Sequence, residues 1–189
     1  MNESRRFFML AALTGLAGAA SLAFAPALAD AALPLHSATD VLRAVANAPG
    51  YHAAGPESGR PIVLARSHGQ SLEQHAETAA LLAAQGFQVL LPHLRDAAPQ
   101  TLGQDLIDFI DKLHMPEAVF VGTGDAAHAA EATTQIRRTR VVGLVLAGPG
   151  ARPAADAAAV PTIALPADAA AQQIADAAAT LARQGKWRT

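Results

Sequence analysis

The segment from Val119 to Ala127 constrains the fold more than any other part of the sequence. It reads Val-Phe-Val-Gly-Thr-Gly-Asp-Ala-Ala, so an apolar run stops at two glycines and an alanine-rich stretch follows. This order predicts a buried strand, a tight turn and a helix. Turns of this kind lie at the carboxyl edge of a parallel sheet, where backbone N–H groups or one exposed side chain meet a ligand.

The rest of the chain repeats the alternation of short apolar runs with helical patterns. Strands that alternate with helices of this length need right-handed crossovers, which predicts an α/β fold in three α/β/α layers with a mostly parallel sheet of about five strands. Glycines and prolines predict a loop over residues 51–61. The expected strands cover residues 62–65, 87–91, 119–122, 141–146 and 161–165, and the expected helices cover residues 38–48, 72–85, 102–113, 125–138 and 169–183.

The first 29 residues resemble an export signal of the twin-arginine type. Arg5 and Arg6 precede an apolar stretch whose hydrophobicity is reduced by glycines. Ala27-Leu28-Ala29 supplies small residues before a cleavage point at Asp30. An ordinary secretory signal and an uncleaved anchor helix stay open as alternatives. We therefore expect residues 1–29 to be a signal peptide and residues 30–189 to be one domain. The expected location is periplasmic or secreted, with membrane contact only through the signal segment if it is not cleaved.

Composition excludes several kinds of chemistry. The 189-residue chain has no cysteine, so disulfides, thiolate metal sites and a cysteine nucleophile are excluded. The formal net charge is -2 and charged residues make up 16%, so we do not expect a nucleic-acid partner. No motif requires a cofactor. Composition leaves the oligomeric state open.

Several short motifs, in their order and spacing, resemble the α/β-hydrolase family between residues 61 and 168. They are similar to the family's oxyanion loop, its helix-to-strand corner, its Pro-Asp-Leu-Arg segment and its nucleophile elbow. The matching residues are, in that order, His68-Gly69, residues 85–89, Pro92-His93-Leu94-Arg95 and Gly122-Thr123-Gly124-Asp125-Ala126. The resemblance implies a compact hydrolase-like core.

The sequence departs from the family at the residues that perform the reaction. Gly124 stands where the family has a Ser, Cys or Asp nucleophile, so no side chain is present to attack a substrate. The catalytic His of the family follows the nucleophile in the chain, but the last histidine of this sequence is His128, only four positions on. Asp168 could take the position of the acid, at a shorter spacing from the fifth strand than is usual.

The two loops are expected to form an oxyanion or ligand-binding surface. Its residues would be His68, Gly69, Gly122, Thr123, Gly124 and Asp125. The candidates for a catalytic role are His68, Asp125 and Asp168. The first two have a structural alternative: His68 as a loop histidine beside N–H donors, and Asp125 as a first-turn carboxylate stabilised by the helix dipole. For Gly124 the elbow geometry predicts a positive φ and a close approach of the loop after the first core strand.

Two other site types remain as alternatives. Gly122-Thr123-Gly124-Asp125-Ala126-Ala127 satisfies the dinucleotide pattern G-x-G-x-x-A, but Leu146-Ala147-Gly148 stands where an acidic ribose ligand is expected. A metal site would need His68, His93 and Asp125 to converge from separate strand ends. No local ligand spacing supports it, so we predict no metal.

These observations predict an exported hydrolase-like protein that lacks the usual nucleophile and catalytic histidine and binds a small apolar or ester-like ligand, or a partner. The first alternative is a weak or atypical hydrolase that acts on a small ester-like substrate, with Asp125 or a water held by His68. The second alternative is a dinucleotide-binding, Rossmann-like protein.

Overall fold

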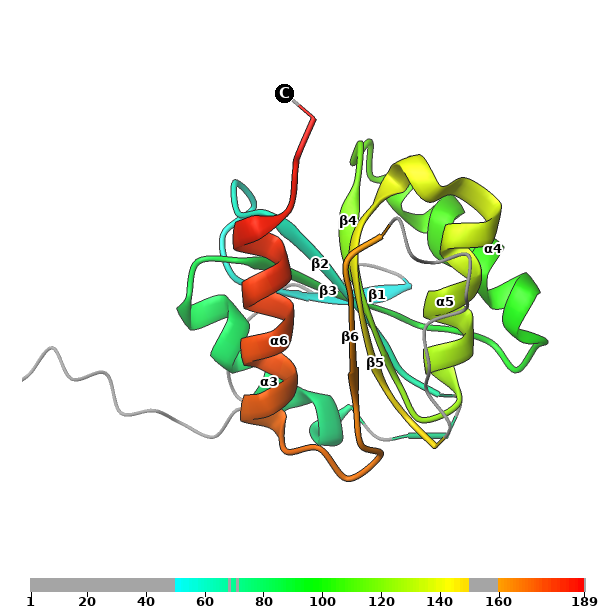
Figure 1. Ribbon diagram of the computed structural model, residues 1–189, viewed down its shortest axis with the longest axis horizontal. Helices are drawn as coiled ribbons and strands as arrows, with labels where there is room; N and C mark the ends of the chain where they lie inside the picture. Colours follow the sequence, from blue (N-terminus) through cyan, green and yellow to red (C-terminus); the bar gives the residue numbers. More distant parts are fainter. Residues whose placement is uncertain (1–49, 68, 71, 150–159, 189) are drawn as a thin grey trace, which may run out of the picture. The chain divides into compact units, whose positions relative to one another are not determined.

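The computed structural model describes residues 50–67, 69, 70, 72–149 and 160–188, all within a compact unit of residues 37–189. Strands and helices alternate along most of this chain (Figure 1). The strands are β1 (Tyr51–Ala54), β2 (Pro61–Ala65), β3 (Gln88–Pro92), β4 (Ala118–Thr123), β5 (Val141–Ala147) and β6 (Thr162–Leu165). The helices are α3 (Glu73–Ala84), α4 (Pro99–Lys112), α5 (Ala126–Arg137), the 3-10 turn η1 (Arg138–Arg140) and α6 (Ala171–Gln184).

The strands form one sheet in the order β1-β3-β2-β4-β5-β6, and all neighbours except β1 and β3 are parallel. The chain first builds outward from β2 to β3, and then crosses back over β2 to place β4 on its other side. The order therefore reverses between β2 and β4. Ligands of open α/β sheets bind in the crevice that such a reversal leaves at the carboxyl ends of the strands.

The sixth strand corrects one expectation from the sequence. Residues 51–61 were predicted as loop, but Tyr51–Ala54 form β1 and pair antiparallel with β3. The free edge of β3 supplies the hydrogen-bonding groups that this four-residue segment needs. Gly55 follows at φ +82 and turns the chain toward β2. The expected helix over residues 38–48 and the signal segment lie outside the described residues.

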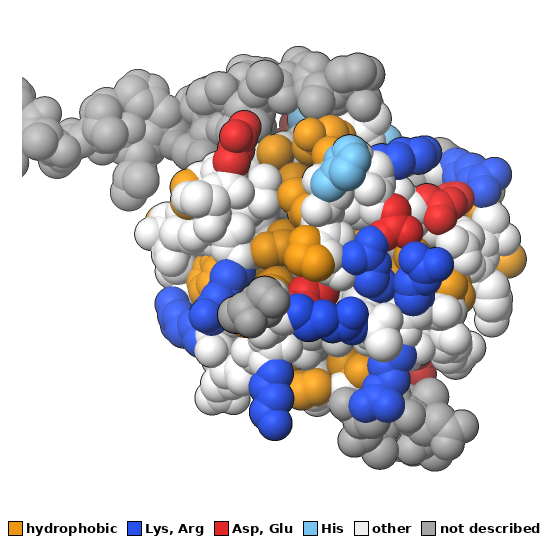
Figure 2. Space-filling view, turned by 90° about the horizontal axis from the view of Figure 1, so that it is seen from above, with side chains coloured by type: hydrophobic (Ala, Val, Ile, Leu, Met, Phe, Trp, Pro, Cys, Tyr) orange, Lys and Arg blue, Asp and Glu red, His pale blue; other side chains and the backbone are white. Residues whose placement is uncertain are grey.

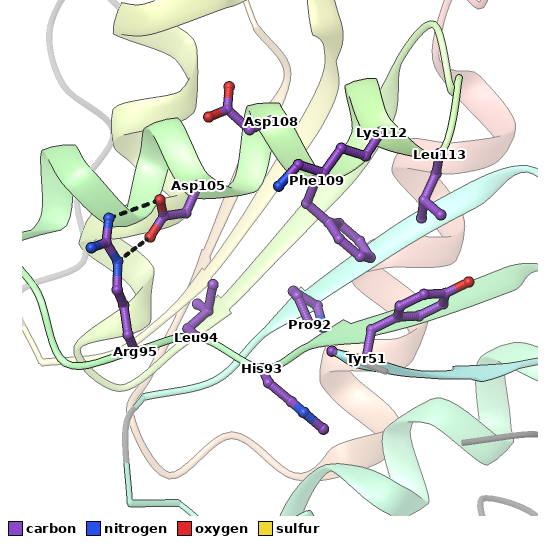
Figure 3. Close-up of a pocket in the computed structure, with 11 residues that line it drawn as sticks. Tyr51, Pro92, His93, Leu94, Arg95, Asp105, Asp108, Phe109, Lys112 and Leu113 are labelled. Carbon is purple, nitrogen blue, oxygen red and sulfur yellow. Dashed lines mark hydrogen bonds and ion pairs between the residues drawn. The ribbon is translucent and has the colours of Figure 1, made fainter. Parts of the chain in front are cut away.

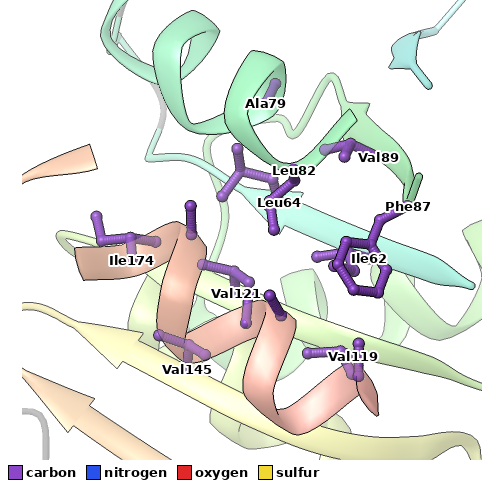
Figure 4. Packing of buried hydrophobic residues seen from close by; sticks show 14 of the residues in the cluster. Ile62, Leu64, Ala79, Leu82, Phe87, Val89, Val119, Val121, Val145 and Ile174 are labelled. Carbon is purple, nitrogen blue, oxygen red and sulfur yellow. The ribbon is translucent and has the colours of Figure 1, made fainter. Parts of the chain in front are cut away.

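Helices cover both faces of the sheet, as expected for three layers (Figure 1). Alternate residues of each strand point to opposite faces, so Ile62, Leu64, Val119 and Val121 pack toward α3 and α6. Figure 4 shows this cluster with Leu82 of α3. On the other face the strands pack against α4 and α5, with Val63, Leu90, Phe120, Leu106 and Ile107 among the buried residues.

The predicted helices begin and end within a few residues of the observed ones. The largest difference is α4, which begins at Pro99 and not at 102. Proline suits the first turn of a helix, because its missing N–H has no partner there in any case. No helix of the described residues is both long and apolar enough to cross a membrane.

Candidate functional site

The carboxyl ends of β2 and β4 bring together two loops that are far apart in the sequence. Parallel pairing of Ala65 with Gly122 places the residues after β2 beside those after β4. The first loop contains Ser67, Gly69 and Gln70, and the second is the turn around Gly124 that leads into α5. The site therefore lies at the reversal of strand order.

Gly124 has φ +58, the sign expected for the elbow. Its N–H donates to the carbonyl oxygen of Ala147 at the end of β5, at 2.8 Å. A β-carbon at this position would lie 3.1 Å from Oγ of Ser67 and 3.2 Å from Nε2 of Gln70. The side of Gly124 on which a nucleophile would project is thus occupied by two side chains from the loop after β2.

The hydroxyl group of Ser67 is fully engaged in joining the two loops. Its Oγ donates to the carbonyl oxygen of Thr123 and accepts from the N–H of Ala126, each at 3.1 Å. A serine nucleophile has to give its proton to a base, whereas this proton is directed at a backbone carbonyl. Ser67 is therefore placed to hold the start of α5 and not to attack a substrate.

A buried hydrogen bond lies beneath the turn. Nε2 of His75, in the first turn of α3, is 2.6 Å from Oγ1 of Thr123. His75 is 4% exposed and Thr123 is 9% exposed. A hydroxyl and an imidazole at this distance have the contact that links a nucleophile to its base, although burial keeps both from bulk solvent.

The three candidate catalytic residues from the sequence are not joined by any described contact. Asp125 is exposed at the N-terminus of α5, and its side chain makes no capping hydrogen bond. Asp168 is exposed in the turn between β6 and α6. His68 lies outside the described residues. Among those that are described, no three His, Cys, Asp or Glu side chains gather as metal ligands would.

The glycines of the G-x-G-x-x-A pattern have a packing role in this fold. A β-carbon on Gly122 would lie 2.5 Å from the carbonyl oxygen of Ala126, so its absence lets α5 approach β4. At Gly124, the direction in which a β-carbon would point already holds Ser67 and Gln70. The close packing of helix and strand explains these glycines without a pyrophosphate.

A pocket of about 470 Å³ lies apart from this turn, between α4 and the strand edge formed by β1 and β3. Its size is within the range of small-molecule sites. Tyr51 and Phe109 contribute aromatic rings in an edge-to-face contact, with centroids 5.3 Å apart. Figure 3 shows Leu94 and Pro92 beside them, and Arg95 joined to Asp105 by two hydrogen bonds of 2.8 and 3.1 Å at one end.

The charges around this pocket are balanced. Arg95 and Lys112 are cationic, and Asp105 and Asp108 are anionic. The hydrogen bonds from Arg95 to Asp105 and the charge of that carboxylate raise the pKa of the arginine above its usual value. An apolar floor with a rim of no net charge favours an uncharged ligand.

Histidines and an arginine form a second electrostatic feature at the carboxyl edge. The rings of His52 and His93 meet edge to face, with centroids 4.8 Å apart. Burial lowers the pKa of His52, and its electrostatic interactions with His93 and Arg66 lower it further. His52 therefore takes up a proton less readily than a free imidazole does.

Comparison with solved structures shows which fold the chain has. A Klebsiella pneumoniae protein assigned as an epoxide hydrolase matches with a TM-score of 0.51 and 22% identity. An α/β-hydrolase enzyme from the metagenome of lagoon sediments at Mar Chica, Morocco, matches with a TM-score of 0.50 and 19% identity. The fold is that of the α/β-hydrolases. No protein-family model matches the sequence, and no curated protein does either.

The chain spans about half the length of these solved structures. The matches cover 58% and 61% of this chain, but only 43% and 56% of the two hydrolases. Identities of this size establish a shared fold only. An activity of this chain has to be argued from the residues of its own site.

Sequence reasoning did not single out three side chains that shape this site. Ser67, Gln70 and His75 lie around Gly124 and Thr123 only because β2 and β4 are adjacent. One sequence signal was available: all three follow an apolar strand within ten residues, where loops of α/β sheets carry functional groups.

Proposed function

We propose that this protein is an exported α/β-hydrolase-like binding protein without conventional hydrolytic activity. The observation that carries the proposal is the environment of Gly124. The residue has no side chain, and Ser67 and Gln70 occupy the space into which a nucleophile would project. Because the Ser67 proton is donated to a carbonyl oxygen, this serine does not replace the missing nucleophile.

The ligand in this proposal is a small, uncharged apolar or ester-like molecule bound between α4 and the β1–β3 edge. The aromatic rings of Tyr51 and Phe109 would contact the apolar part of the ligand. The balanced charges on the rim of the pocket would disfavour a ligand that carries a net charge. The hydrolase fold of the compared structures supports a ligand of this class.

Two measurements test the loss of catalysis. A fluorophosphonate probe should not label the purified protein, whereas stoichiometric labelling would refute the proposal. The Gly124→Ser variant should also stay almost unlabelled, since the described atoms nearest to the new side chain belong to Ser67 and Gln70, and neither residue is a general base.

The binding site is tested with N-phenyl-1-naphthylamine, an uncharged fluorescent probe. We expect saturable binding that Phe109→Ala weakens by about tenfold, the loss expected when one aromatic wall is removed. Leu72→Ala is the control, because Leu72 is also half-buried but packs on the α3 face of the sheet. Equal binding by Phe109→Ala and the native protein would rule out this pocket.

The hydrogen bond between Thr123 and His75 favours a second function, slow hydrolysis of a small ester. Either Thr123 could act as nucleophile with His75 as base, or Asp125 or a water held by His68 could act at the turn. Turnover of p-nitrophenyl butyrate lost in Thr123→Val and kept in Thr123→Ser would support the first route. Equal turnover by the native protein and His68→Ala would exclude the second.

Export by the twin-arginine pathway to the periplasm or beyond is also part of the proposal. It rests on Arg5 and Arg6, the apolar stretch after them and the small residues before Asp30. Amino-terminal sequencing of protein recovered outside the cytoplasm should give Asp30. A retained Met1 in the cytoplasm would refute it.

A further inference from the structure

Basic side chains gather at one end of the sheet. Of the ten lysines and arginines among the described residues, eight lie at the amino edge, where strands begin and helices end, opposite the glycine turn. Figure 2 looks onto this edge and shows blue side chains spread across it. The eight are Arg60, Lys112, Arg137, Arg138, Arg140, Arg183, Lys186 and Arg188.

Topology causes this gathering, since each basic residue ends a helix, follows one or precedes a strand. Helices that cross between parallel strands run opposite to them, so these positions meet at the same edge. Lys112, Arg137 and Arg183 stand in last helical turns, where the helix dipole favours a cation. The dipoles of these α-helices do not account for the other five.

Few described carboxylates oppose this charge. Among the residues that the structure describes, Glu57, Asp111 and Glu117 are the acidic ones at the same edge. Asp111 pairs with Arg137 and Arg140, and the buried Glu117 pairs with Arg188. The described residues of this edge therefore carry an excess of positive charge, although the chain has a formal net charge of -2.

Two more cations on this edge, Arg60 and Arg183, have contacts with uncharged groups. Arg60 donates to the carbonyl oxygen of Ala182 and lies over the ring of Trp187. Arg183 donates to the side-chain amide of Gln85 and lies over the ring of Phe87. Carbonyl groups and rings orient a guanidinium without neutralising it, so these charges remain available to an external anion.

We propose that this basic edge docks on an anionic lipid bilayer surface. The cations come from four separate segments and are spread over the edge, which suits an extended surface better than one small anion. Apolar side chains lie among them in Figure 2. Trp187 stands half-buried between Lys186 and Arg188, and Ile136 is 36% exposed beside Arg137. Mixed basic and apolar or aromatic side chains are typical of protein surfaces at a membrane interface.

The test is co-sedimentation of the full-length chain with vesicles of phosphatidylcholine alone or with added phosphatidylglycerol. We expect binding to the anionic vesicles only, and its loss at high salt. Arg183→Gln with Lys186→Gln should weaken it by about tenfold or more, because each interfacial cation contributes separately. The control is Gln100→Glu with Thr101→Glu, which changes net charge equally at the opposite edge and should alter binding less than about twofold.

Three results would overturn the proposal. Equal binding to neutral vesicles would indicate insertion of the apolar N-terminal segment. Equal losses in the two double variants would indicate a dependence on net charge and not on this edge. Absence of vesicle binding together with salt-sensitive binding to heparin or DNA would indicate an acidic polymer as the partner.

Discussion

The hydroxyl oxygen of Thr123 lies 2.6 Å from Nε2 of His75, in the interior of the molecule. Thr123 is the last residue of β4, and His75 lies in the first turn of α3. One hydrogen bond thus joins the strand that precedes the glycine turn to the helix that follows β2. It helps to hold the loop containing Ser67 against Gly124, which is the arrangement that fills the nucleophile position.

Removing this hydroxyl should destabilise the fold. Thr123→Val keeps the shape of the side chain but takes the hydroxyl away from the buried imidazole, and we expect the free energy of unfolding to fall by about 1–3 kcal/mol. Thr123→Ser retains the hydroxyl and should lose less. Urea unfolding of the three proteins measures the difference. Equal stability of the valine variant and the native protein would show that the hydrogen bond contributes nothing.

A methyl group on Gly124 should be costly for two reasons. Its φ of +58 disfavours a β-carbon, and that atom would crowd Ser67 and Gln70 at 3.1 and 3.2 Å. We expect Gly124→Ala to lower the free energy of unfolding by about 1–3 kcal/mol. Gly86→Ala separates the two causes, because Gly86 has φ +84 and no atom within 4 Å of its absent β-carbon.

The difference between these two glycine variants reports the crowding alone. We expect Gly124→Ala combined with Gln70→Ala to be more stable than the sum of the single changes implies, since truncation of Gln70 makes room for the methyl. Equal losses at Gly86 and Gly124, with additive double variants, would mean that the loop after β2 does not occupy the nucleophile position in solution.

The parts of the fold that were predicted depend on local patterns. Residues 62–65 and 141–146 form continuous apolar runs, which are typical of strands buried on both faces. β1 was missed because its four residues are polar or small and are flanked by Gly50 and Gly55. Its existence depends on the free edge of β3, a partner 41 residues away at the Tyr51–Pro92 pair.

The site could be predicted in position but not in contacts. The two glycines at 122 and 124 located the turn, because few other residues fit there. The contact of Ser67 with Ala126 depends on the register between β2 and β4. The sequence of neither segment indicates this long-range pairing. The basic edge could not be predicted from the sequence for a similar reason. The net charge of a chain does not indicate which of its basic residues lie together in the fold.

Acid should weaken the fold through His52. Burial, His93 and Arg66 lower the pKa of His52 below its ordinary 6.5, so the folded state resists a proton that the unfolded chain accepts. The contribution of His52 to the free energy of unfolding is therefore fully present above about pH 6.5, the pKa in the unfolded chain. It is lost as the pH falls toward the lowered pKa of the folded state. The urea midpoint should decline more steeply from neutral to acid pH for the native protein than for His52→Gln. Parallel pH profiles would contradict this assignment.

Two strand glycines should respond differently to the same change, because they face different neighbours. A β-carbon on Gly122 would lie 2.5 Å from the backbone oxygen of Ala126 and 2.6 Å from Cα of Ala127. On Gly143 a β-carbon would lie 3.1 Å from Cβ and Cδ1 of Leu181 and 3.3 Å from the carbonyl oxygen of Pro161, so these neighbours would have to move by only a few tenths of an ångström. We expect Gly122→Ala to cost about 3 kcal/mol or more, and Gly143→Ala about 1 kcal/mol or less.

The larger loss has a local cause, since a methyl on Gly122 pushes the first turn of α5 away from β4. That movement would also break the hydrogen bond from Ala126 to Ser67, so the loop after β2 would loosen together with the helix. Urea unfolding measures the stability of both variants, and amide hydrogen exchange at Ala126 measures the local effect. Unchanged exchange protection at Ala126 in a folded Gly122→Ala protein would show that α5 does not depend on this glycine for its position.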